Sequence, residues 1–289
     1  MPTAHANGID LEYETMGDPS DPALLMVMGL GGQLIAWSEG FVAQLTDRGF
    51  FTIRFDNRDV GLSTKFEGMP EITALFGGDH SSAPYRVEDM ADDAAALLTE
   101  LGVAQAHVMG VSMGGMITQA LAVNHTDRVR SACSIMSTTG DRTIGAPSGE
   151  AIAALLRPIA TSREEAIAAS LEASKVIGSP AYPTPDDVLT ERAAAAYDRC
   201  YCPEGTARQL GAILASPDRT EALSGLRMPF LVIHGEADPL VSLSGGEGTA
   251  AAVPGCTFIT IPGMGHDLPE ALWGQIISAV VANTALAAV

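Results

Sequence analysis

The serine best placed for nucleophilic chemistry lies in the pentapeptide Gly110–Gly114, which reads Gly-Val-Ser-Met-Gly. A strand-like apolar run, Ala106–Met109, precedes it, and a helix-forming run, Met116–Val123, follows it. A serine at a sharp turn between a strand and a helix presents its hydroxyl above the edge of the sheet. Glycines on both sides of the serine let the strand and the helix pass close together. This context, more than the short pattern itself, predicts that Ser112 is a nucleophile.

A serine hydroxyl needs a general base, because it is a weak nucleophile at neutral pH. Of the six histidines, His266 follows the glycine-rich stretch Pro262–Gly265, between the last strand-like run and the final helical run. A loop at the carboxyl edge of the sheet can bring an imidazole to the serine hydroxyl. We therefore predict that His266 is the base. The remaining histidines lie in less suitable places: His5, His80, His107, His125 and His234.

An acid must orient the imidazole of that base, and three carboxylates lie near enough in the sequence. Asp238 comes just past the strand-like run Phe230–Ile233. Glu236 is nearer to that run, and Asp267 adjoins the histidine, where neighbouring side chains rarely meet in a suitable geometry. We predict that Asp238 is the acid, with Glu236 and Asp267 as its rivals.

A second glycine-rich stretch, Met28–Gly32, reads Met-Gly-Leu-Gly-Gly and follows the strand-like run Ala23–Val27. A backbone N–H in such a turn can face the nucleophile and stabilise the negative charge that develops on an attacked carbonyl oxygen. The N–H of Met113, at the start of the helix after Ser112, points to the same place. A simple flexible turn is the alternative interpretation of these glycines.

A sheet must hold these residues at one edge, and the apolar pattern predicts one. Short apolar runs bounded by Gly, Pro and Asp are typical of strands buried on both faces, as in a parallel sheet. Helical patterns alternate with them, which indicates an α/β protein. The predicted strands are 9–14 in an antiparallel edge hairpin, then 23–28, 51–55, 106–109, 132–136, 230–233 and 257–261. The predicted helices around the sheet are 41–49, 87–101, 116–123 and 272–286.

One long segment interrupts the alternation of strands and helices. Between about Thr139 and Arg227 we find helix formers and no convincing strand, with the helical runs 163–176, 185–199 and 205–215. The pattern predicts a helical insertion between two strands of the core. The predicted division is a first core part at 1–138, a helical cap at 139–227 and a second core part at 228–289. Plain packing elements would have the same alanine-rich composition.

The overall composition excludes several classes of protein. The 289 residues are 47% hydrophobic and carry 16 Lys and Arg against 35 Asp and Glu, a net charge of −19. Such an acidic field repels phosphate backbones and anionic lipid headgroups, which disfavours nucleic-acid and membrane-surface binding. The four scattered cysteines form no disulfide framework. With no leader-like or membrane-spanning run evident, we expect a soluble cytoplasmic protein, either a monomer or a homodimer.

These motifs together resemble those of the α/β-hydrolase family, especially small bacterial carboxylesterases and lipases of the aclacinomycin methylesterase type. The matching segments cover both parts of the core: 28–32, 54–63, 110–114, 234–238 and 262–266. The resemblance implies an α/β-hydrolase fold with a mostly parallel sheet, helices on both faces and an inserted helical cap. It implies Ser112, Asp238 and His266 as the catalytic triad. It also implies the backbone N–H groups of Leu30 and Met113 as the oxyanion hole.

One departure from the family pattern concerns the residue before the first glycine of the oxyanion turn. Many relatives carry histidine there, whereas this chain has Met28, which keeps the backbone donors. In the second motif we interpret the charges of Asp56, Arg58 and Asp59 as bracing of a loop. Met28, Gly31 and Met264 are the candidate residues of a substrate pocket, which the methionines would make adaptable, and plain filling of the core is the alternative for the methionines.

The predicted activity is ester hydrolysis through an acyl-enzyme on Ser112, with no cofactor and no metal. The predicted partner is a small apolar ester. A thioesterase, a lactonase, a carbon–carbon bond hydrolase and a cofactor-free perhydrolase use the same triad and remain open. An acyltransferase and a non-catalytic ligand-binding protein on the same fold are further alternatives.

Overall fold

The computed structural model describes residues 2–288 and contains one eight-stranded sheet. The strands lie in the order β1-β2-β4-β3-β5-β6-β7-β8. β2 pairs antiparallel with β1 and β4, and all other neighbours pair parallel. The bounds are β1 (Thr3–Ala6), β2 (Ile9–Met16), β3 (Ala23–Val27), β4 (Phe51–Phe55), β5 (Ala106–Val111), β6 (Val129–Ile135), β7 (Phe230–Gly235) and β8 (Thr257–Ile261). The carboxyl ends of β3 and β5 to β8 therefore meet at one edge.

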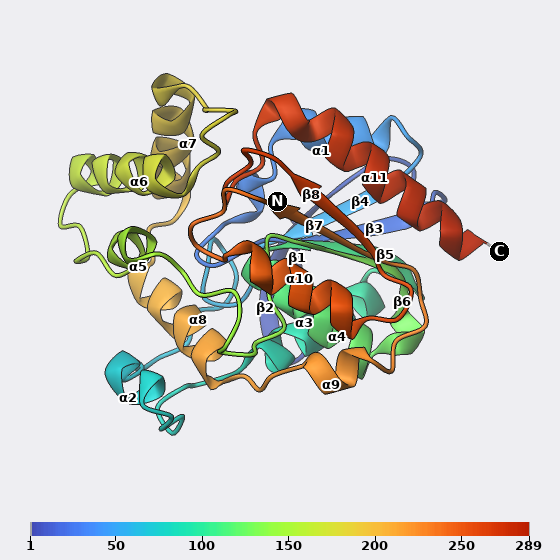
Figure 1. Cartoon of the computed structure of the whole chain (residues 1–289), viewed down its shortest axis with the longest axis horizontal. Coiled ribbons are helices and arrows are strands. Elements are labelled where there is room, and N and C mark those ends of the chain that lie inside the picture. The colour runs from blue at the N-terminus through green and yellow to red at the C-terminus, as the bar shows by residue number, and fades with distance from the viewer. Residues whose placement is uncertain (1, 289) are drawn as a thin grey trace.

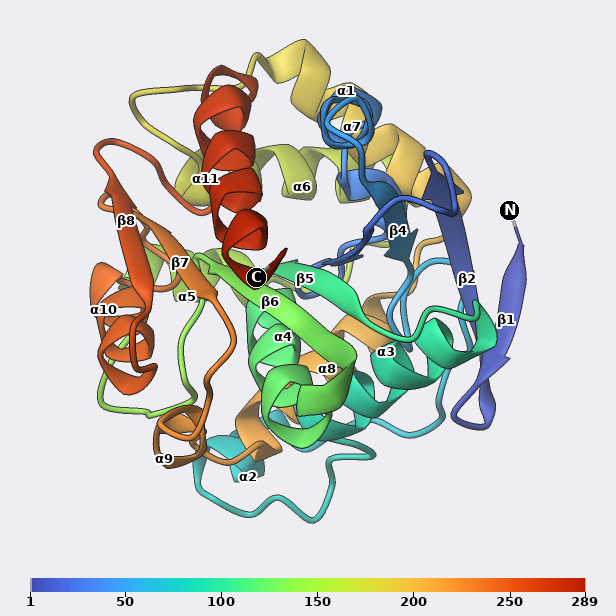
Figure 2. The same cartoon turned by 90° about the vertical axis from the view of Figure 1, so that its right-hand side faces the viewer.

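Helices cover both faces of this sheet and bury two apolar layers (Figures 1 and 2). α3 and α4 pack on one face, and α1 and α11 pack on the other. Every residue of β3 and β5 is buried, which explains their uninterrupted apolar sequences. The bounds are α1 (Glu39–Thr46), α2 (Ile72–Phe76), α3 (Val87–Glu100), α4 (Met113–Asn124), α10 (Leu243–Ala252) and α11 (Trp273–Ala285).

The chain between β6 and β7 forms helices, as the pattern predicts for that segment. These are α5 (Gly149–Leu155), α6 (Arg163–Ile177), α7 (Asp186–Arg199), α8 (Pro203–Ala215) and α9 (Thr220–Leu223). In Figure 1, α5, α6 and α7 stand away from the sheet, and α8 leads back from them toward it. Every residue of α6 and α7 is at least partly exposed, whereas α8 buries six residues against the core. Among residues 2–288, every helix is too short or too polar to cross a bilayer.

Several elements differ from the sequence prediction because tertiary contacts overrule local propensity. The helix expected from Met116 begins at Met113. Its Gly114 lies so close to β3 that a Cβ there would come within 2.1 Å of the Val27 carbonyl oxygen. α10 was not predicted, since its glycines disfavour a helix. One of them, Gly246, lies against His234, where a Cβ would come within 2.4 Å of the imidazole Nδ1. The short helices α2, α5 and α9 also lie outside the predicted set.

His107, in the middle of β5, is expected to make the fold sensitive to acid. It is buried, with its Nδ1 2.8 Å from the Ser131 hydroxyl of β6, and burial lowers its pKa from 6.5 to about 4. Protonation then favours the unfolded chain. The free energy of unfolding should therefore fall by about 1.4 kcal/mol for each pH unit between about 6.5 and about 4.

Urea unfolding near neutral pH and again near pH 5 measures this dependence. His107→Asn, which keeps a polar atom near the Ser131 hydroxyl, should lose less stability on acidification than the wild type does. His5→Asn, at an exposed side chain, is the control. Equal losses in the wild type and His107→Asn would contradict this assignment of the acid sensitivity.

Candidate active site

Ser112 occupies a strained turn between β5 and α4. Its backbone angles are φ 56° and ψ −122°, a conformation that non-glycine residues adopt only when the surroundings impose it. The surroundings are tight, because a Cβ at Gly110 would lie 2.0 Å from the carbonyl oxygen of Gly114. Strand and helix thus meet at the turn, as the Gly-x-Ser-x-Gly pattern predicts. The hydroxyl of Ser112 faces the carboxyl edge of the sheet.

Two hydrogen bonds join Ser112, His266 and Asp238 into a continuous chain. The Nε2 of His266 lies 2.9 Å from the Ser112 Oγ, and its Nδ1 lies 2.7 Å from the Asp238 Oδ2. His266 is 8% exposed and Asp238 is 6% exposed, so these bonds are largely shielded from water. The loop after β8 places the imidazole, and its backbone is fixed by the His266 N–H, which donates to the Ile177 carbonyl oxygen at 2.7 Å.

The carboxylate of Asp238 is itself held in place by the turn that follows β7. Its Oδ1 accepts hydrogen bonds from the backbone N–H groups of Leu240 and Val241, each at 2.9 Å. The two rival acids are engaged elsewhere. Glu236 accepts a hydrogen bond from the Thr260 hydroxyl at 2.8 Å, and Asp267 accepts one from the Ser179 hydroxyl. Of the three carboxylates, only that of Asp238 contacts the imidazole.

His234, which the sequence did not single out, lies directly behind this acid. Its Nε2 is 2.8 Å from the Val241 carbonyl oxygen and 3.6 Å from the Asp238 Oδ2. A carbonyl oxygen can only accept, so this nitrogen carries the proton. Burial lowers the pKa of His234, which keeps the ring neutral. The imidazole thus supports the turn that holds the acid, and its position at the end of a strand before Asp238 was the available signal.

The two candidate oxyanion donors belong to residues that lie beside Ser112. A Cβ at Gly29 would lie 3.1 Å from the Ser112 Cβ and 3.7 Å from its Oγ, so the turn of Leu30 runs directly past the serine. Met113 is the first residue of α4. Within residues 2–288, the N–H groups of Leu30 and Met113 donate no hydrogen bond to another group. Both are available to an oxygen bound beside Ser112.

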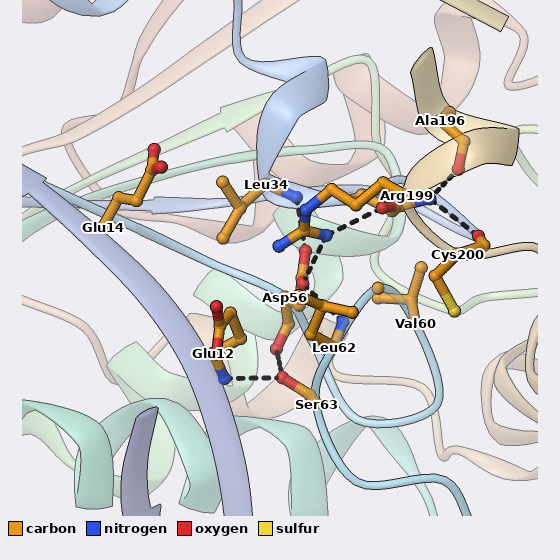
Figure 3. Close-up of polar contacts among 12 residues, drawn as sticks. Glu12, Glu14, Leu34, Asp56, Val60, Leu62, Ser63, Ala196, Arg199 and Cys200 are labelled. Carbon is orange, nitrogen blue, oxygen red and sulfur yellow. Dashed lines mark hydrogen bonds and ion pairs between the residues drawn. The ribbon is translucent and has the colours of Figure 1, made fainter. Parts of the chain in front are cut away.

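A buried carboxylate after β4 fixes the far end of the same turn (Figure 3). Asp56 is fully buried and accepts hydrogen bonds from the backbone N–H groups of Leu34 at 2.7 Å and Leu62 at 2.8 Å. It also forms an ion pair with Arg199, whose Nη1 lies 2.7 Å away at the end of α7. Arg58 likewise forms an ion pair with Asp93, and Asp59 forms one with Arg208. The charges of this motif brace loops, as predicted, and two of them also hold the helical segment.

Comparison with known proteins identifies the fold of the chain. A family model described as the alpha/beta hydrolase fold matches residues 22–158. Rhodomycin D methylesterase of Streptomyces sp. strain C5 is 27% identical and covers 97% of this chain and 97% of its own length. An enol-lactonase structure from Burkholderia xenovorans LB400 has a TM-score of 0.77 and 25% identity, covering 98% of this chain and 100% of that chain. The chain has the α/β-hydrolase fold. A third relative, 3-oxoadipate enol-lactonase 2 of Acinetobacter baylyi, is 28% identical over 85% of this chain and 82% of its own length. Together the relatives indicate a hydrolase that acts on ester bonds.

The protein has a cavity of about 440 Å³ between the Leu30 turn and the helical segment. Aliphatic and aromatic side chains from α5 to α8 and from the loop after α5 form most of its wall, among them Leu155, Ile159, Ala193, Tyr197 and Leu210. Leu30 and Gly31 are among its lining residues, and they belong to the turn that runs past Ser112.

The predicted pocket residues fall in two different environments. Gly31 lines the cavity. Met28 and Met264 instead belong to the apolar core against α1 and α11, where Met264 is fully buried. The expectation that they line the pocket is wrong for these two side chains, because they point into the sheet layer rather than toward the helical segment. The helices that do form the wall carried no sequence signal beyond their apolar residues.

Proposed function

We propose that this protein is a serine carboxylesterase with Ser112 as the nucleophile, His266 as the base and Asp238 as the orienting acid. The observation that carries the proposal is the hydrogen-bonded chain from the Ser112 Oγ through His266 to Asp238, at 2.9 and 2.7 Å. A nucleophile, a base and an orienting acid in contact, next to a turn that lines a cavity, are what acyl transfer requires.

The reaction proceeds in two half-reactions. His266 takes the proton of Ser112 as the oxygen attacks the ester carbonyl, and the N–H groups of Leu30 and Met113 stabilise the resulting oxyanion. The imidazolium returns the proton to the departing alcohol, leaving the acyl group on Ser112. Water, deprotonated by His266, then attacks the acyl carbonyl, and the imidazolium returns the proton to the Ser112 oxygen as the acid leaves. The backbone donors act in both steps, since both pass through a tetrahedral oxyanion.

The cavity supports an assignment of the two halves of the ester. The leaving oxygen must face the His266 Nε2, and on that side the chain between α6 and α7 packs against the histidine loop. A Cβ at Gly265 would lie 2.4 Å from the Gly178 carbonyl oxygen, and the Ala181 N–H donates to Gly263 at 3.2 Å. The cavity instead opens from Leu30. We assign the apolar acyl part to the cavity, under the segment 139–227 acting as a cap, and a small alcohol to the crowded side. The methylesterase relative supports this assignment.

Initial rates on p-nitrophenyl esters from acetate to palmitate, followed by methyl, butyl and benzyl esters of one apolar acid, test the proposal. Turnover that Ser112→Ala abolishes, with methyl esters preferred, is the expected result. Turnover on thioesters, enol-lactones, ring-cleavage products or peroxide but not on esters would select an alternative chemistry of the same triad. Tight ligand retention without turnover would indicate a binding protein.

Narrowing the cavity is expected to discriminate against long acyl chains. Ala193 of α7 lines the wall, and Ala195 on the same helix faces solvent. Ala193→Trp should raise KM for the longer esters by about 10-fold and leave KM for the acetate ester nearly unchanged. The reason is that each acyl methylene that no longer fits in the cavity loses about 0.8 kcal/mol of binding free energy. Ala195→Trp is the matched control. An equal change for acetate and the long esters would place the acyl chain elsewhere.

A further inference from the structure

The residue after the candidate oxyanion donor Leu30 is held by a side chain of the helical segment. The Gly31 N–H donates to the Oε1 of Gln209, on α8, at 2.8 Å. The Nε2 of the same amide donates to the Arg58 carbonyl oxygen at 2.8 Å. Because that carbonyl can only accept, the orientation of the amide is unambiguous. Gln209 is fully buried and thus ties the Leu30 turn to α8 without competition from water.

This contact acts on a stretch of backbone that has little stiffness of its own. Gly31 has a φ of +67°, and glycine can adopt many other conformations at low energy. Its N–H belongs to the peptide plane that follows Leu30, so fixing that plane also limits the direction of the Leu30 N–H. The helix adds a steric limit, because a Cβ at Gly31 would lie 2.9 Å from the Thr206 Oγ1.

We propose that Gln209 is a positioning residue that aims the Leu30 N–H at the oxyanion. The inference rests on the proposed esterase function. It makes the helical segment part of the catalytic machinery, because the donor of the core is directed, through Gly31, by a side chain located 178 residues after that glycine. Misplacing a donor by about 1 Å lowers rates by up to about 100-fold.

A purely structural role for Gln209 would be to dock α8 on the core. The neighbouring residue, Arg208, already performs that role. Arg208 forms two hydrogen bonds with Asp59, at 2.9 and 2.8 Å, and one with the Gly68 carbonyl oxygen at 3.0 Å. Gly205 approaches the Asp59 carbonyl oxygen so closely that a Cβ would lie 1.9 Å from it. Arg208→Met therefore weakens the docking of α8 and leaves the acceptor of the Gly31 N–H intact, which makes it the matched control.

The experiment compares Gln209→Met with Arg208→Met on a p-nitrophenyl ester that the wild type hydrolyses. We expect Gln209→Met to lower kcat by about 10- to 100-fold with KM nearly unchanged, since the donor acts on the transition state. A trifluoromethyl ketone adds reversibly to the Ser112 hydroxyl and forms an alkoxide in the oxyanion site. Its affinity should fall by a similar factor. Arg208→Met should lower the melting temperature and keep kcat within about 3-fold.

Several outcomes would overturn the inference. One is Gln209→Met retaining kcat and ketone affinity within about 2-fold, and another is Arg208→Met losing as much kcat. In both cases Ser112-dependent turnover by the wild type leaves the esterase proposal intact. Absence of that turnover removes the esterase proposal and the inference together. Should Gln209→Met fail to fold, Gln209→Asn keeps a buried amide but is one methylene too short, and the same loss of kcat is expected.

Discussion

Ser112→Ala is expected to lower kcat for ester hydrolysis by about 10⁴- to 10⁶-fold while leaving the protein folded. The hydroxyl removed is the one that lies 2.9 Å from the His266 Nε2. Without it no acyl-enzyme can form, and the remaining rate reflects only the backbone donors and substrate binding. The smaller side chain keeps the Cβ within the strained turn, so the strand and helix around it are unaffected.

Stopped-flow and steady-state assays on the same p-nitrophenyl ester measure this loss of kcat. The wild type should release a burst of p-nitrophenol equal to its active sites if deacylation is the slower step. Ser134→Ala, at a buried serine of β6 beside β5, is the control and should retain most of the activity. Comparable rates in Ser112→Ala and the wild type would remove Ser112 from the mechanism.

Asp238→Asn is expected to lower kcat by about 10³- to 10⁴-fold. The carboxylate accepts from the Nδ1 of His266 at 2.7 Å, which leaves Nε2 free of its proton and ready to accept that of the serine. An asparagine amide at this position can present its NH₂ to Nδ1, which stabilises the opposite tautomer and places the proton on the wrong nitrogen. It also cannot stabilise the imidazolium.

The rival acids are the matched controls for this substitution. Glu236→Gln and Asp267→Asn change carboxylates that bond to Thr260 and Ser179 instead of the imidazole, so both should retain kcat within about 5-fold. A pH profile of each variant separates the two cases, because the loss in Asp238→Asn should persist at every pH. If Glu236→Gln lost more activity than Asp238→Asn, the acid would be wrongly assigned.

The core of the site could be predicted because its residues follow strand ends. Parallel strands deliver their carboxyl ends to one edge, so a serine after β5, an acid after β7 and a histidine after β8 necessarily lie close together. Local chemistry sufficed to select Ser112 and His266 as candidates, since a glycine-flanked turn and a glycine-rich loop are each visible in a few residues. Asp238 needed the additional judgement that Glu236 lies too near the strand, and the Thr260 contact of Glu236 agrees with it.

The rest of the site depends on contacts between residues far apart in the sequence. Gln209 lies within an ordinary amphipathic helix, and nothing near it in the chain indicates that its amide meets Gly31. His234 supports the acid through the Val241 carbonyl oxygen, and α10, a glycine-rich helix that local propensity disfavours, packs against its imidazole. The pocket predictions for Met28 and Met264 failed for a related reason, since proximity to a site in sequence does not fix the direction of a side chain.

The most direct test of the account is to label the active protein with a fluorophosphonate and map the modified peptide by mass spectrometry. Esterase activity should disappear in step with the appearance of one adduct, located on Ser112, and Ser112→Ala should take up none. An adduct on another residue, or full loss of ester hydrolysis without modification of Ser112, would contradict the assignment of the nucleophile.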